Sequence, residues 1–131
     1  LKYCSQFESR LRKYWRCGTM ALKPYLLEMG MGVDIHGRDY TLATSWAVTN
    51  ALWHKSLYFA RSLGVGPESM RVEVTIGVPE PDAVDREAVL DVLPHGRGTI
   101  KIVKGGLEIP NEDGSDAIVM ANAAVLVSLE V

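Results

Sequence analysis

Asp34 and His36 are the two residues of this sequence whose types and spacing best suit chemistry. They stand two positions apart in a segment with strand periodicity, so both side chains are predicted to leave the same face of a sheet. A carboxylate beside an imidazole orients the ring and suits general acid–base work. With Glu28, the same pair supplies ligands for a divalent metal. The third interpretation is structural: Asp34 caps a turn, and His36 bonds to it or to a neighbouring chain.

Gly30, Gly32 and Gly37 surround this pair and are predicted to wall the site, because a missing Cβ lets a ligand or another backbone approach closely. Their spacing matches only part of a dinucleotide-binding fingerprint. A third glycine is missing, and the first two lie inside the predicted strand instead of after it. The sequence also has no Walker-type Gly-Lys-Ser/Thr element. A Rossmann or P-loop nucleotide site is therefore not predicted.

Arg38, His54 and Lys104 are the predicted ligand-binding neighbours of the pair. Arg38 precedes an expected helix N-terminus and Lys104 stands beside two glycines, so each is a candidate anchor for an anion. For both, the alternative is an exposed surface cation. His54 lies late in a mostly apolar helix, where the alternative is a hydrogen-bonded core or interface residue. The sequence names no cofactor and leaves open whether a metal is bound.

The elements that must position these residues alternate between strand and helix patterns. Residues 24–36 have a period of two, with an unbroken apolar row on one face and glycines among ionisable groups on the other. A helix that is apolar nearly all round is expected over residues 40–63, with Asp39 as its N-cap. The elements expected after it are a strand over 70–78, a short helix capped by Asp82 or Asp85 and ending at Leu93, and strands over 98–104 and 117–131.

This order predicts one α+β domain, a four-stranded mixed sheet with two helices on one face in the sequence β-α-β-α-β-β. Two helices cover only one face of such a sheet. The other face is predicted to be polar and either open to water or closed against identical subunits, so a homo-oligomer, a trimer or larger, is expected. The polar residues assigned to that face are Glu28, Asp34, His36, Arg71, Glu73, Thr75, Thr99 and Lys101.

The run from Gly30 to Gly37 reads Gly-x-Gly-x-Asp-x-His-Gly and resembles the hallmark of a small family of conserved hypothetical proteins. The resemblance covers nearly all of residues 20–131 and implies no particular activity. The predicted order of elements also resembles the chorismate-mutase-like fold, which is shared with the reactive-intermediate deaminases. Those proteins form trimers with ligand sites between subunits. This second resemblance is one of topology and implies a fold and an assembly, not a reaction.

Composition separates a basic N-terminal extension from an acidic domain. Residues 1–19 hold five Lys and Arg against one Glu, whereas residues 20–131 hold 9 basic and 15 acidic residues, giving a net charge of −2 over 131 residues. The extension is predicted to lie outside the domain, either as upstream sequence or as the remnant of a targeting prefix. Cys4 and Cys17 both lie in it, so the domain is predicted to lack disulfides and Cys-based metal sites.

The small net charge argues against a general nucleic-acid-binding protein, and no apolar run is long enough to cross a bilayer. A cytoplasmic location is predicted, or an organelle if residues 1–19 come from a targeting prefix. Two functions remain open. In the first, the protein binds or transforms a small polar metabolite at a subunit interface, with His36 as acid–base and Asp34 as its orienter. In the second, it is a non-catalytic homo-oligomeric binding or assembly protein whose motif is structural. The sequence does not decide whether the protein is an enzyme.

Overall fold

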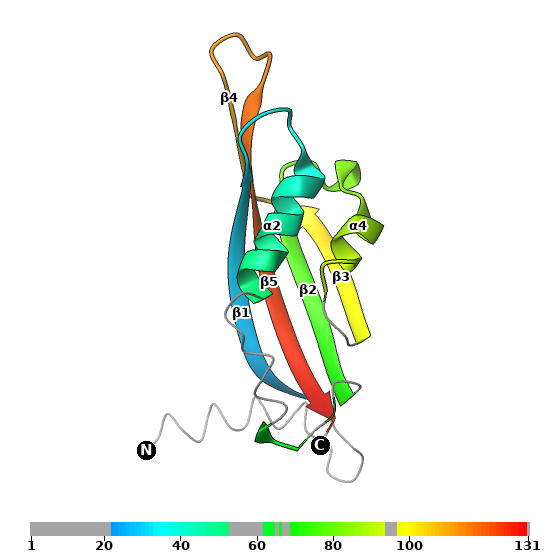
Figure 1. Ribbon diagram of the computed structural model, residues 1–131. Coiled ribbons are helices and arrows are strands. Elements are labelled where there is room, and N and C mark those ends of the chain that lie inside the picture. The colour runs from blue at the N-terminus through cyan, green and yellow to red at the C-terminus, as the bar shows by residue number, and fades with distance from the viewer. Residues whose placement is uncertain (1–21, 53–61, 65, 67–68, 94–96, 131) are drawn as a thin grey trace, which may run out of the picture.

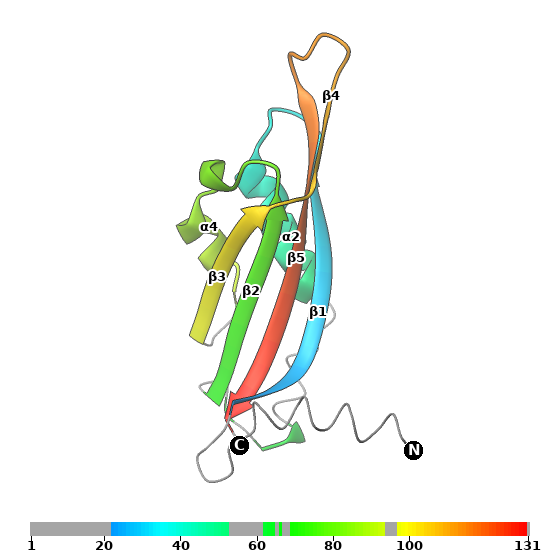
Figure 2. The same cartoon turned by 180° about the vertical axis from the view of Figure 1, so that it is seen from behind.

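The computed structural model describes residues 22–52, 62–64, 66, 69–93 and 97–130. Their strands form one sheet, and the helices lie together on one of its faces (Figures 1 and 2). In chain order the elements are β1 (Leu22–Asp34), α2 (Tyr40–Leu52), β2 (Met70–Val78), the 3₁₀ turn η4 (Pro81–Ala83), α4 (Arg86–Leu90), β3 (Arg97–Lys104), β4 (Leu107–Pro110) and β5 (Ala117–Glu130). The predicted extension 1–19, residues 53–61 of the predicted helix, and therefore His54 lie outside the described residues. Among the described helices, none is long and apolar enough to span a membrane.

The sheet is mixed, as predicted, with the order β1-β5-β2-β3. β2 and β3 run parallel, and β5 runs antiparallel to both β1 and β2. The predicted number of four strands is wrong, because a fifth strand, β4, pairs with the first residues of β5. β2 reaches only to Asn122 of β5, so the earlier residues of β5 need another partner for their backbone groups. β4 supplies it after the chain crosses over Gly77 of β2, where the Gly105 amide donates to the Val78 carbonyl at 3.0 Å.

Two aspartates begin the helices, because each side chain accepts amide N–H groups that have no partner within the helix. Asp39 accepts the Leu42 amide at 2.9 Å, which confirms it as the N-cap of α2. Asp85, not Asp82, caps α4 and accepts the amides of Glu87 and Ala88 at 3.1 and 3.3 Å.

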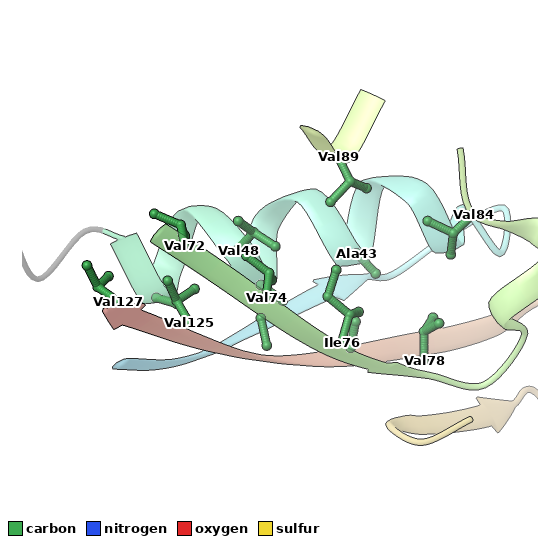
Figure 3. Packing of buried hydrophobic residues seen from close by; sticks show 14 of the residues in the cluster. Ala43, Val48, Val72, Val74, Ile76, Val78, Val84, Val89, Val125 and Val127 are labelled. Carbon is green, nitrogen blue, oxygen red and sulfur yellow. The ribbon is translucent and has the colours of Figure 1, made fainter. Parts of the chain in front are cut away.

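The core lies between the helices and the sheet and consists mainly of valine and alanine (Figure 3). Alternate residues of β2 and β5 point toward the helices, as the strand period requires. The small side chains let α2 lie close to the sheet. The buried members are Ala43, Ala47, Val48 and Ala51 of α2, Met70, Val72, Val74, Ile76 and Val78 of β2, Val84 before α4 and Val89 within it, and Val119, Ala121, Ala123, Val125, Val127 and Leu129 of β5.

β1 presents the opposite face from the one predicted. Its apolar row points away from the helices, and Met29 and Met31 are 67% and 53% exposed. The face with Gly30, Gly32 and Asp34 is the one that α2 covers. The prediction that polar residues line the uncovered face is therefore correct for β2 and β3, but it is wrong for β1, whose polar residues lie on the side that α2 covers.

The reason is the distance between the two backbones. A Cβ on Gly30 would lie 2.3 Å from the Ala47 carbonyl oxygen, and one on Gly32 would lie 2.1 Å from the Ala43 carbonyl oxygen. Any side chain at these positions would displace α2. The glycines do admit another backbone, as predicted, but it is the backbone of α2 in the same chain. We refer below to the uncovered side of the sheet, opposite α2 and α4, as the open face.

Candidate functional site

Asp34 is the last residue of β1 and is only 7% exposed. Its Oδ2 accepts the backbone N–H of Asp39 at 2.9 Å, which ties the end of the strand to the residue that begins α2. The prediction that His36 shares a strand face with Asp34 is wrong, because β1 ends at Asp34. Asp34 therefore closes the turn between strand and helix, as the structural interpretation expected.

Asp116, not Asp34, is the carboxylate bonded to His36. The His36 Nδ1 donates to Asp116 Oδ2 at 3.3 Å, although the His36 side chain is 82% exposed. The amides of Gly37 and Ala117 donate to Asp116 Oδ1 at 2.9 and 2.8 Å. These donors, the Gly37 amide first, lower the pKa of Asp116 below its ordinary value. Sequence reasoning missed Asp116, because no local pattern connects residues that are 80 positions apart.

Arg38, the predicted anion anchor, is held by groups of its own chain. Its guanidinium donates to the carbonyls of Gly114 and Ser115 at 3.1 and 3.4 Å, and its Nε lies 3.5 Å from Glu108 Oε1. The backbone of Arg38 has a φ of 49°, in the left-handed region that non-glycine residues seldom adopt. These bonds hold the residue in that conformation.

Tyr40, in the first turn of α2, adds a further bond to this group of residues, which we call the cluster: His36, Gly37, Arg38, Glu108 and Asp116. Its hydroxyl donates to Glu108 Oε1 at 2.5 Å. Because this bond keeps the phenol protonated, it is the main cause that raises the pKa of Tyr40 to about 12. Sequence reasoning missed both Tyr40 and Glu108, since neither stands in a recognisable motif with the other.

These bonds join the motif loop (residues 35–39) and the first turn of α2 to the β4–β5 hairpin (residues 107–120). The hairpin extends beyond the rest of the sheet, and the motif loop lies beside it (Figures 1 and 2). Its turn is also bonded within itself: the Asn111 amide donates to the Asp116 carbonyl at 2.9 Å, and Ser115 donates to Asp113. The cluster thus fixes the direction of the hairpin relative to β1 and α2.

The remaining predicted residues do not join this cluster. Lys104 is exposed at the end of β3, on the edge of the sheet opposite β1. Glu28 is half-buried on the helix side of β1. Within the described part of the chain, no three His, Cys, Asp or Glu residues are grouped so that they could hold a metal ion. The predicted metal set of Glu28, Asp34 and His36 is therefore not assembled.

Acid is expected to weaken the bonds that Asp116 makes. Because its folded-state pKa is lowered, its contribution to stability is complete above the ordinary value of 3.8 and is lost as the pH falls through the lowered pKa. We expect the free energy of unfolding to fall less steeply between about pH 4 and pH 2 in Asp116→Asn than in the wild type. Urea unfolding at a series of pH values measures this slope.

Glu112→Gln is the control for that measurement, since Glu112 is an exposed carboxylate in the same turn. Its slope should match the wild type. An Asp116→Asn protein with the wild-type slope would show that the carboxylate contributes nothing to the joint between loop and hairpin.

The structure defines an α+β protein with a single mixed sheet, in which the sequence motif packs a helix on its first strand and ties a loop to a projecting hairpin. The chain belongs to the conserved hypothetical protein family Lin0512_fam, whose model matches residues 24–127. This match confirms the resemblance to a family of conserved hypothetical proteins.

A solved structure from Nostoc punctiforme PCC 73102, described as an FtsZ-like protein of unknown function, is also similar. It is 40% identical, with a TM-score of 0.74 over 86% of this chain and 99% of that one. A search of curated proteins found no match. The comparisons therefore place the chain in a conserved family of unknown function.

Proposed function

We propose that this protein is a non-catalytic assembly protein, whose copies associate through the open face of the sheet and whose motif is structural. The observation that carries the proposal is an uncovered apolar strip on that face. Its members are 39 to 67% exposed: Leu27, Met29, Met31 and Val33 of β1, Leu107 and Ile109 of β4, and Ile118 of β5.

The register of the strands makes this strip continuous. Val33 pairs with Met120, which pairs in turn with Leu107 on its other side, and Ile118 pairs with Ile109. A monomeric protein rarely leaves an apolar patch larger than ~300–600 Å² uncovered. Seven large apolar side chains on one face approach the ~800 Å² that each partner buries in a stable interface. A second copy of the chain, which brings the same strip, is the occupant that we propose.

The other half of the open face is polar and supplies a rim. Glu73 and Thr75 of β2 pair with Thr99 and Lys101 of β3, and none of these four side chains is buried. An apolar centre beside a polar rim is the ordinary composition of an interface between proteins.

A structural role for the motif agrees with the bonds of its residues. Gly30 and Gly32 are in contact with α2, Asp34 accepts the Asp39 amide, and His36 and Gly37 bond to Asp116.

A trimer or larger ring, a chorismate-mutase-like arrangement of the strands and a cytoplasmic location are parts of the same proposal. The order β1-β5-β2-β3 and the absence of cysteine from residues 20–131 support the last two.

The test is to place a charge in the centre of the strip. Met29→Lys is expected to weaken self-association by at least tenfold, because a lysine at this position would have to be buried unpaired. Light scattering over a range of concentrations measures the change in mass. Ala83→Lys, which adds the same charge at an exposed position of η4, should leave the mass unchanged.

Two results would contradict the proposal. One is a wild-type protein that stays monomeric at every concentration, and the other is a Met29→Lys protein with wild-type mass. The metabolite function predicted from the sequence would show itself differently. Small polar metabolites would then raise the melting temperature of the wild type, and His36→Ala would abolish that effect without changing the mass.

A further inference from the structure

β1 is an outer strand of the sheet, paired with β5 on one side over the described residues. Its 13 residues make a long edge. A free edge offers a row of backbone donors and acceptors to which a strand of another chain can add. Native proteins usually block such an edge.

Asn50 of α2 bonds to the middle of this edge. The Met31 backbone N–H donates to Asn50 Oδ1 at 3.0 Å, so this amide points away from β5, toward the side of β1 where the described residues place no strand. In an antiparallel pair, alternate residues turn their backbone groups to the same side, so the amides of Met29 and Val33 share the direction of Met31. A strand added at this edge would have to bond to the amides of Met29, Met31 and Val33, and the Met31 amide is already bonded to Asn50.

Both sides of this edge are apolar, which makes it attractive to another strand. Leu42, Trp46 and Asn50 follow one another at helical spacing along α2, and the first two are exposed. The Trp46 Cβ lies 2.7 Å from the place that a Cβ on Gly32 would occupy, so this side of the helix runs along β1. Met29 and Met31 flank the edge from the open face. In the absence of a block, these surfaces would favour strand addition.

We propose that Asn50 prevents the β1 edges of two copies from pairing, so that copies meet through the open face and not edge to edge. The choice of association surface rests on the proposed function, whereas the block at the edge does not. Asn50 acts here as a specificity-determining residue for assembly. Its amide oxygen satisfies the Met31 N–H within the chain and removes it from the ladder that an incoming strand would need.

The test compares Asn50→Ala and Asn50→Leu, which lack the acceptor, with Asn50→Asp, which keeps an acceptor oxygen. The first two should increase the rate of hydrogen exchange at the Met31 amide by at least tenfold, and Asn50→Asp should change it little. Asn50 is exposed, so the fold is expected to persist, and circular dichroism checks this. The Leu variant separates loss of the bond from loss of volume.

Self-association is measured in a protein that also carries Ile109→Lys. This lysine places a charge on the open face, where it is expected to weaken association through that face, but it lies away from β1 and leaves the edge unchanged. Adding Asn50→Ala or Asn50→Leu should convert the species present in that background into one of twice the mass as concentration rises, whereas adding Asn50→Asp should not. This result is expected whether or not the wild type associates through the open face, so the two proposals fail separately. Unchanged Met31 exchange, or unchanged mass, in both Asn50→Ala and Asn50→Leu would overturn the inference.

Discussion

Gly32→Ala is expected to lower the free energy of unfolding by about 3 kcal/mol or more, at the upper end of the cost of overpacking. The added Cβ would lie 2.1 Å from the Ala43 carbonyl oxygen and 2.3 Å from the Ala47 nitrogen. Both obstacles are helix backbone, which cannot turn aside as a flexible side chain can. To make room for the added Cβ, α2 and the core beneath it would have to shift together. Urea unfolding followed by circular dichroism measures the loss of stability.

Gly77→Ala is the matched control, since Gly77 also lies inside a strand but faces the crossover from β3 to β4. A Cβ there would meet the Gly105 Cα at 3.5 Å, an ordinary van der Waals contact. Its effect should stay within about 1 kcal/mol. If Gly32→Ala were as stable as Gly77→Ala, the close packing of α2 on β1 would not be what requires the glycine.

Asp34→Ala is expected to destabilise the protein by about 2 kcal/mol, because the Asp39 amide loses its acceptor at a partly buried position. Asp39 is also the N-cap of α2, so the helix start becomes less well fixed. Thermal or urea unfolding measures the change.

Asp34→Asn and His36→Ala complete this experiment. The asparagine keeps an acceptor oxygen and should cost less than about 1 kcal/mol. His36 is exposed, and its removal should cost no more than about 0.5 kcal/mol. Equal stability of Asp34→Ala and the wild type would remove the structural interpretation of Asp34 and return weight to an acid–base role.

The elements with local signals were predictable. Asp39 stands directly before an apolar helical pattern, and the alternation of β2 from Met70 to Val78 matches its buried and exposed residues. The fifth strand was not predictable from such signals. β4 has only four residues, all exposed, and it forms because β5 is longer than β2.

The candidate site was only partly predictable. The motif predicts a ligand site walled by Gly30 and Gly32 beside Asp34, whereas in the structure these residues contact α2 and the Asp39 amide. For His36 the partner is Asp116 of the hairpin, which the antiparallel pairing of β1 with β5 brings beside it.

By itself, the sequence determined the α+β class, the order of most elements and the N-cap of α2, because periodicity and capping act between residues that are neighbours in the chain. The tertiary structure alone decided which face of β1 is covered. Hydrophobicity would turn the row of Leu27, Met29 and Met31 inward, but α2 approaches β1 too closely for side chains, and only the glycine face can accept it. That close contact leaves the apolar row on the open face, where we place the assembly surface.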